Sequence, residues 1–153
     1  MFSITKAVCR NAFLAIAFLA PLSAAAQEAC TTYTVQEVME RLDDPAVQIV
    51  DIRDVRELQA EGTVVGAYHA PRCMLEFWVD PESPYHKKIF ADDSKRFVLF
   101  CGAGWRSALA AKTLQDMGMT NVAHIDGGFA DWVKQAAPVE SYEAHRARRH
   151  PAK

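Results

Sequence analysis

Hydrophobic residues occur along the chain in two kinds of segment. Three short, continuous runs are rich in β-branched residues and are typical of strands buried on both faces of a parallel sheet. They are VQIVDI at 47–52, RFVLF at 96–100 and NVAHID at 121–126. Between them, apolar residues recur at helical spacing. Strands that alternate with helices predict an α/β fold with a parallel sheet that helices cover on both faces.

Four helices are expected from this spacing and from the residues that start and stop helices. They are 35–42, VRELQAEG ending at Gly62, 106–117 ending at Gly118, and GGFADWVKQ as the last one. Thr34 and Glu37 form a capping-box pattern at the start of the first helix. VVGAYHAP predicts an extended segment that Pro71 closes. The stretch 72–96 is rich in turn residues, so only one short helix near 85–90 is expected there.

The first 26 residues resemble an export signal rather than part of the fold. They contain two basic residues, a short apolar run at 12–20, and small residues at Ala24 and Ala26. The apolar run is shorter than the about 20 residues that a membrane-spanning helix needs. We therefore expect a signal peptide over 1–26 that is cleaved near Ala26, and a periplasmic protein. Contact with a membrane is expected only if this segment is retained as an anchor.

Removal of the first 26 of the 153 residues leaves 127, which suits one domain with its own core. We expect this domain over 27–140, followed by a basic tail at 141–153. The formal net charge of the full chain is −2, and loss of Lys6 and Arg10 with no acidic residue makes it −4. This balance argues against nucleic acid as a partner. The basic tail is expected to be solvated, and no function is assigned to it.

Three of the four cysteines remain after export: Cys30, Cys73 and Cys101. An odd number in an oxidising compartment leaves at least one thiol free or paired with another molecule. Cys73 has two alternative roles. It forms a disulfide with Cys101 as a redox switch, or it is inert or pairs with Cys30.

The segment FCGAGWRSA places a thiol where a buried strand ends and a helix begins. Backbone N–H groups at a helix start lack partners within the helix and attract an anion. The small residues Gly102, Ala103 and Gly104 let the backbone wrap closely around the sulfur. The arrangement favours the thiolate of Cys101, which is the nucleophilic form. The alternative is an inert buried thiol, and no metal or other cofactor is expected because no paired metal-ligand spacing occurs.

Four segments resemble, in order, the motifs of rhodanese-type sulfurtransferases. They are DIRDVREL, EGTVVGAYHAP, CGAGWRS and DGGFADW, and the matches run from about residue 32 to 140. The resemblance implies a rhodanese-like fold with a five-stranded parallel sheet. It also implies that Cys101 accepts a sulfane sulfur from an anionic donor, such as thiosulfate or a persulfide, and passes it to cyanide or a thiol. A sulfur-accepting protein is a further expected partner.

In this interpretation the N–H groups of residues 102–106 stabilise the persulfide, and the loop continues through Trp105 and Arg106 to Ser107. Arg106 attracts an anionic donor or forms a structural ion pair. Trp105 shields the sulfur or forms a wall of the acceptor pocket.

Asp51 and Arg53 are supporting residues, expected to form a charge pair beneath the loop rather than to act directly.

Two other functions stay open. Cys101 and Arg106 are separated by four residues, one fewer than in the loop of tyrosine phosphatases, and a shorter loop fits one sulfur better than a phosphate. A cysteine-dependent phosphatase or arsenate reductase is therefore the first alternative. A non-catalytic rhodanese-like binding module is the second, although such a module would tolerate loss of the cysteine that is present here.

Overall fold

The computed structural model describes residues 30–149 of the 153. The signal peptide expected over residues 1–26 and the last four residues lie outside this part. Among residues 30–149, no helix is both long enough and apolar enough to cross a membrane.

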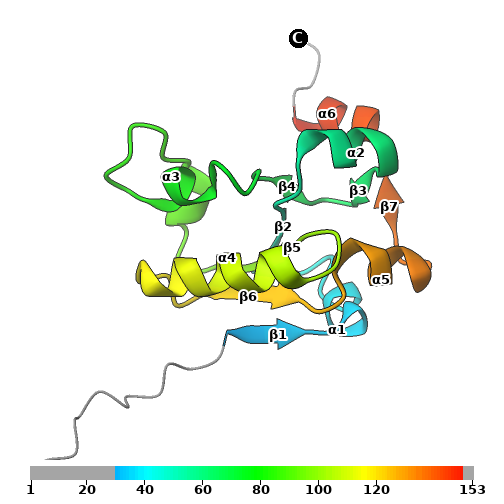
Figure 1. The fold of residues 1–153 in the computed structure, drawn as a ribbon, viewed down its shortest axis with the longest axis horizontal. Coiled ribbons are helices and arrows are strands. Elements are labelled where there is room, and N and C mark those ends of the chain that lie inside the picture. The colour runs from blue at the N-terminus through cyan, green and yellow to red at the C-terminus, as the bar shows by residue number, and fades with distance from the viewer. Residues whose placement is uncertain (1–29, 150–153) are drawn as a thin grey trace, which may run out of the picture.

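Five parallel strands form the central sheet in the order β1-β6-β5-β2-β4 (Figure 1). They are β1 (Thr31–Tyr33), β2 (Val47–Asp51), β4 (Tyr68–His69), β5 (Arg96–Phe100) and β6 (Val122–Ile125). Two short strands, β3 (Thr63–Val64) and β7 (Val139–Glu140), pair antiparallel beside it. The predicted α/β fold with a five-stranded parallel sheet is confirmed.

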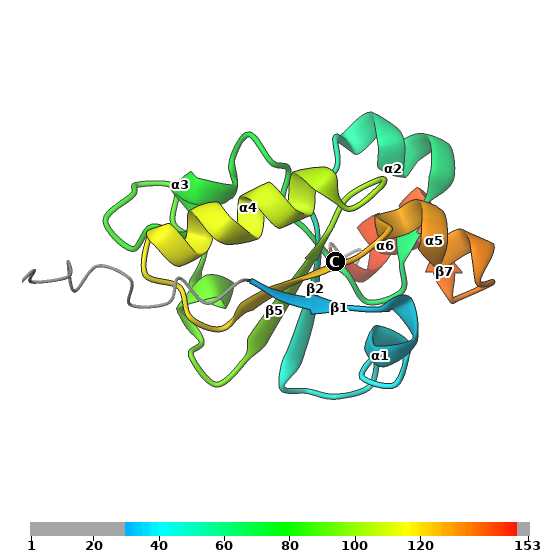
Figure 2. The ribbon, with the colours of Figure 1, turned by 60° about the horizontal axis from the view of Figure 1, so that its bottom comes forward.

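Helices cover both faces of the sheet (Figure 2). They are α1 (Val35–Met39), α2 (Val55–Glu61), α3 (Leu75–Val79), α4 (Trp105–Asp116), α5 (Gly128–Lys134) and α6 (Tyr142–Arg149), with a 3₁₀ turn η1 (Lys88–Ala91). The central strand β5 alternates between two cores. Val98 and Phe100 pack with α1 and α5, whereas Phe97 and Leu99 pack with α4. Both faces of β5 are therefore buried, as its continuous apolar sequence predicts.

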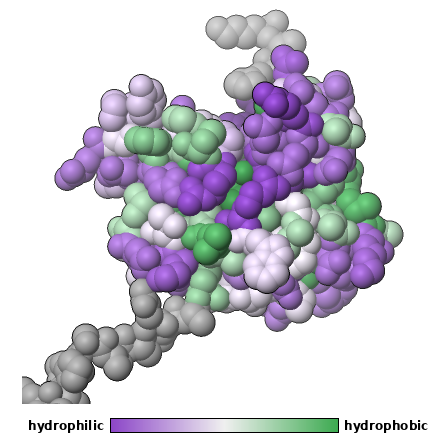
Figure 3. Space-filling view, in the orientation of Figure 1, coloured by the Kyte–Doolittle hydropathy of each residue, from purple (hydrophilic) through white to green (hydrophobic). Residues whose placement is uncertain are grey.

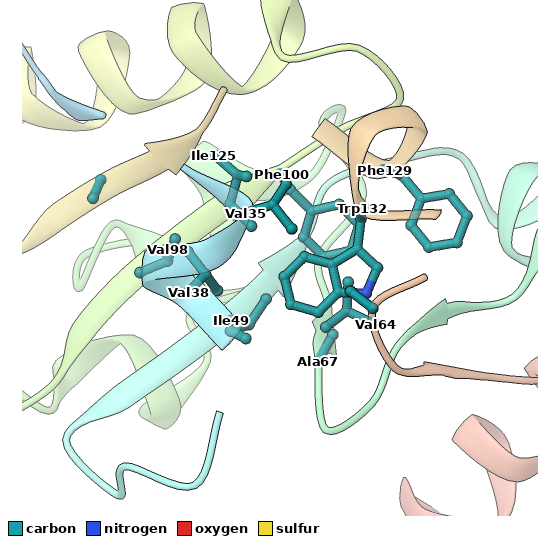
Figure 4. Packing of buried hydrophobic residues seen from close by; sticks show 12 residues of the cluster. Val35, Val38, Ile49, Val64, Ala67, Val98, Phe100, Ile125, Phe129 and Trp132 are labelled. Carbon is teal, nitrogen blue, oxygen red and sulfur yellow. The ribbon is translucent and has the colours of Figure 1, made fainter. Parts of the chain in front are cut away.

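Trp132 of α5 links the small sheet to the large one (Figure 4). Its side chain is fully buried among residues that include Val64 and Ala67. Its indole N–H donates to the carbonyl oxygen of Pro138 at 2.9 Å, which satisfies the polar atom of a buried aromatic ring. Trp132 thus packs α5 against both sheets.

Five segments differ from the sequence-based expectations. The strand β1 and the helix α3 were not predicted, and the helix expected near 85–90 is the 3₁₀ turn η1. The helix α5 is not the last element, because β7 and α6 follow it.

The basic end of the chain, expected to be solvated, forms α6 as far as Arg149 and packs on the domain. His145 is buried there. Arg148 pairs with Glu140 at 2.6 Å and donates to the carbonyl oxygen of Ala67 at 3.0 Å. Polar contacts rather than an apolar stripe hold this helix, so its hydrophobic pattern gave no sign of it.

A fully buried ion pair joins the end of β2 to the segment after α2. The guanidinium of Arg53 donates to both carboxylate oxygens of Asp51, with an Nη2–Oδ2 distance of 2.8 Å. It also donates to Glu61 at 2.9 Å and to the carbonyl oxygen of Gly62 at 2.6 Å. Thr63 donates its hydroxyl proton to Asp51 at 2.7 Å. Each charge is thereby paired and hydrogen-bonded, as burial requires.

Replacement of Arg53 by Met should lower the free energy of unfolding by roughly 3–5 kcal/mol, because it leaves Asp51 buried without its countercharge. Urea denaturation followed by circular dichroism measures the change. The matched control is Arg56→Met, since the Arg56 side chain is 90% exposed and this variant should stay within about 0.5 kcal/mol of the wild type. Equal stability of the two variants would contradict a structural role for the buried pair.

Candidate active site

Cys101 lies directly after β5, at the edge of the sheet where the carboxyl ends of the parallel strands meet. Its side chain is 1% exposed and packs in the core cluster beside α4. Gly102, Ala103 and Gly104 follow, and α4 starts at Trp105. The predicted order of strand, thiol, small-residue loop and helix is what the structure shows.

The loop surrounds the sulfur with hydrogen-bond donors. Burial by itself raises the pKa of Cys101. The N–H groups of Ser107, Ala103 and Gly104 and the hydroxyl of Ser107 oppose this effect and lower the pKa below the ordinary value of a thiol. Donors that stabilise the charged form outweigh desolvation here. The site therefore favours a thiolate although water scarcely reaches it.

The start of α5 holds the other side of the loop. The N–H of Phe129 donates to the carbonyl oxygen of Cys101 at 2.7 Å, and the N–H of Ala130 donates to that of Gly102 at 2.9 Å. These bonds turn two loop carbonyls toward α5. The N–H groups of Ala103, Gly104 and Ser107, which follow in the chain, are directed to the sulfur of Cys101.

Gly128 is required by this close approach. Its φ is +60°, and a Cβ atom there would lie 2.8 Å from the amide nitrogen of Gly104 and would overlap the carbonyl oxygen of Cys101. Gly104 has a φ of +88°, which L side chains rarely adopt. Two glycines thus allow the loop and α5 to meet through backbone atoms alone.

Arg106 forms an ion pair with Glu57 of α2. Its two terminal nitrogens each donate to a carboxylate oxygen at 2.7 Å. The hydrogen bonds from Arg106, together with the N–H of Asp54, outweigh desolvation and lower the pKa of Glu57. Glu57, and to a lesser extent the charge of Cys101, raise the pKa of Arg106. Of the two roles considered for Arg106, the structure shows the ion pair.

Asp51 and Arg53 lie beneath this site rather than in it. Both are fully buried, and the Arg53 guanidinium stacks 3.8 Å from the ring centroid of Phe129 and 5.6 Å from that of Phe100. The contact of Arg53 with Phe129 places this buried charge pair against the start of α5.

A pocket of about 390 Å³ adjoins the loop. It is lined by Glu57, Glu61, Gly102, Phe129, Ala130 and Val133. Trp105 is not among these residues and its side chain is 80% exposed, so it neither shields the sulfur nor forms a wall of this pocket. Sequence reasoning missed Glu57 and Glu61 as pocket residues. Glu57 lies three residues after Asp54, and this spacing predicts a capping box at the start of α2. The same spacing does not predict that Glu57 also pairs with Arg106.

The three cysteines that the structure describes are all free. Cys30 is half-buried, and its thiol lies 3.9 Å from the carbonyl oxygen of Val122, whereas Cys73 is exposed. No disulfide links Cys73 to Cys30 or to Cys101 within residues 30–149.

Comparison with known proteins places this geometry in a family. The rhodanese-like domain matches residues 34–135. A solved protein of unknown function from Rhodopseudomonas palustris CGA009, described as a possible tyrosine phosphatase, is 48% identical with a TM-score of 0.70; the match covers 72% of this chain and 85% of that one.

Curated relatives are more distant. A mouse protein, thiosulfate sulfurtransferase/rhodanese-like domain-containing protein 3, is 26% identical over 126 residues, which cover 77% of this chain and 80% of that protein. A tRNA uridine(34) hydroxylase from Synechococcus sp. (strain CC9605) is 33% identical over 101 residues, which cover 65% of this chain and 31% of the hydroxylase. The chain spans about a third of the length of the hydroxylases that it matches. With the Cys101 loop, the five-stranded sheet and this match over two thirds of its length, the chain belongs to the rhodanese-like domain family.

Proposed function

We propose that this protein is a sulfurtransferase that carries a sulfane sulfur on Cys101 as a persulfide. The observation that supports it most is the Cys101 thiol, which is buried at the end of β5 with a lowered pKa inside a ring of N–H donors. Such a ring stabilises a second anionic sulfur as well as the thiolate, because its donors point to where the negative charge develops.

The reaction proceeds in two half-steps. The Cys101 thiolate attacks the outer sulfur of the donor, and a new S–S bond forms while the bond in the donor breaks. With thiosulfate, sulfite leaves with the electron pair. A nucleophile such as cyanide or a thiolate then attacks the outer sulfur of the persulfide, and the electron pair of the broken S–S bond returns to Cys101. The product is thiocyanate or a persulfide of the acceptor thiol.

The charge around the loop bears on the choice of donor. Two carboxylates, those of Glu57 and Glu61, line the pocket, and Arg106 is already neutralised by Glu57. A dianion such as thiosulfate meets little uncompensated positive charge here. A persulfide of a small thiol, which carries less negative charge, suits this pocket better, and the apolar side chains of Phe129 and Val133 offer a surface for its body.

An acceptor thiol on a protein would reach the loop across the start of α4. Trp105 and Leu109 lie one helical turn apart there and are 80% and 68% exposed. Large exposed apolar side chains beside a reactive sulfur fit contact with a protein surface. We extend the proposal to export: residues 1–26 direct the chain to the periplasm and are removed.

A cysteine-dependent phosphatase is the second candidate, since the 48% identical protein is described as a possible tyrosine phosphatase. Two features oppose it. Four residues separate Cys101 from Arg106, one fewer than in phosphatase loops. Arg106 is also paired with Glu57, and the negative charge of this carboxylate would repel a phosphate held by the same guanidinium.

Incubation with a thiol persulfide or with thiosulfate should add about 32 Da to the protein, one sulfur atom on Cys101. Intact-mass spectrometry measures this, and the persulfide donor should label faster than thiosulfate. Cys101→Ser should gain no sulfur. Cys73→Ser is the matched control, because it removes an exposed cysteine and should label as the wild type does.

Hydrolysis of an aryl phosphate should be measured on the same samples. Efficient hydrolysis that Cys101→Ser abolishes, without any sulfur uptake by the wild type, would support the phosphatase instead. A folded wild type that neither takes up sulfur nor hydrolyses phosphate would leave the binding module as the remaining function.

The rate of persulfide formation from thiosulfate should rise with pH and level off below about 8.5, the ordinary thiol pKa, because the pKa of Cys101 is lowered. Stopped-flow measurements between about pH 5 and 9 test this. Ser107→Ala removes a hydroxyl donor and should move the midpoint to higher pH, whereas Ser94→Ala on the surface should not. A midpoint at or above that of free cysteine would contradict the proposed loop electrostatics.

Amino-terminal sequencing of the protein from its native cells should start at Gln27, directly after the small residues at Ala24 and Ala26. The periplasmic fraction should contain this shortened form. Recovery of the chain with its first 26 residues from the cytoplasmic fraction would refute export.

A further inference from the structure

A second pocket, of about 250 Å³, lies on the other side of α2 from the catalytic loop. It is lined by Val55, His69, Trp78, Tyr142, His145, Arg146 and Arg149. Val55 of α2 faces it, whereas Glu57 and Glu61 of the same helix face the first pocket. His69 ends β4, which is two strands away from β5 in the sheet, so the two sites are separated by about 10 Å of sheet width.

Two arginines of α6 bring uncompensated positive charge to this pocket. No carboxylate of residues 30–149 forms an ion pair with Arg146 or Arg149, whereas their neighbour Arg148 is paired with Glu140. Hydrophilic side chains gather over α2 and α6 on the face shown in Figure 3. An anion that entered the pocket would supply the missing countercharge.

Arg149 is held in place before any ligand arrives. Its guanidinium stacks 3.9 Å from the ring centroid of Tyr68, and one of its nitrogens donates to the carbonyl oxygen of His69 at 3.4 Å. Arg146 is 5.9 Å from the ring centroid of Tyr142. A preordered arginine loses less side-chain entropy when it binds an anion than a free one does.

Aromatic and apolar side chains form the remaining walls. Trp78 of α3 is half-buried and meets Tyr68 edge to face, with a centroid distance of 6.4 Å. Tyr142 and Val55 complete this apolar part. The volume is below the range of about 300–1,000 Å³ that is typical of pockets for drug-sized ligands, so one ring with an acidic group is the size that fits.

We propose that this pocket binds a small aromatic anion, a carboxylate or sulfonate on a single ring. Arg146 and Arg149 hold the acidic group, and Trp78 and Tyr142 pack on the ring. The site uses neither Cys101 nor its loop, so it is independent of the proposed sulfur transfer.

The three tryptophans of the chain allow a direct test by NMR of their indole N–H groups. Trp78 lines the pocket, Trp105 is beside the catalytic loop and Trp132 is in the core. Titration with benzenesulfonate should shift the Trp78 signal saturably, with a Kd on the order of 1 mM, and leave the Trp132 signal unchanged. Sodium sulfate lacks the aromatic ring and benzyl alcohol lacks the negative charge. Each should therefore bind at least about tenfold more weakly than benzenesulfonate.

Arg146→Gln should weaken benzenesulfonate binding roughly tenfold, because it removes a charged hydrogen-bond donor. Arg149→Gln should do the same, with circular dichroism used to confirm that α6 remains folded. Arg56→Gln is the matched control, since it removes the same charge from an exposed position on α2 and should bind as the wild type does. Cys101→Ser should also bind normally, so failure of this proposal is distinguishable from failure of sulfur transfer.

Three results would overturn the proposal. They are a Trp78 signal that does not shift saturably, equal weakening by Arg56→Gln and Arg146→Gln, and a shift confined to Trp105 that Cys101→Ser abolishes. The last result would mean that the anion binds only at the catalytic loop.

Discussion

The buried guanidinium of Arg53 makes the contacts on which the rest of the candidate active site depends. It joins the end of β2, through Asp51, to the end of α2, through Glu61 and the carbonyl oxygen of Gly62. Its flat face packs on Phe129 of α5. A buried charge tolerates no loss of its partners, so these segments must keep their relative positions. Phe129 also donates its N–H to the carbonyl oxygen of Cys101. Arg53 is therefore connected to the Cys101 loop through a single residue, Phe129.

The helix α2 organises the surface above this buried pair. Glu57 accepts a hydrogen bond from the N–H of Asp54 at the start of α2 and two more from Arg106 at the start of α4. The carboxylate of Glu57 thus caps α2 and also links α2 to α4 across the loop. Its charge also cancels that of Arg106, and this leaves the surroundings of the sulfur governed by backbone N–H groups rather than by a free cation.

The sequence predicted the parts of the fold that local patterns determine. Three buried strands, the caps at Thr34 and the thiol at the start of α4 follow from residue order alone. The strand β1 was missed because its three residues are polar and mostly exposed, so they lack the pattern of a buried strand. The helix α3 has no side-chain cap at Met74, and α6 is held by long-range polar contacts. The requirement for Gly128 appears only when α5 and the loop are seen together.

The hydrogen bonds from α5 to the carbonyl oxygens of Cys101 and Gly102 hold the backbone of this loop in place without using its side chains. The peptide dipoles around the sulfur are oriented before it gains charge, so ionisation demands little reorganisation of its surroundings. That environment is built from main-chain N–H groups and the buried hydroxyl of Ser107, whereas the side chains of Ala103 and Trp105 are exposed to solvent. Those two positions can therefore diverge to suit a different partner while the reactivity of the sulfur is conserved.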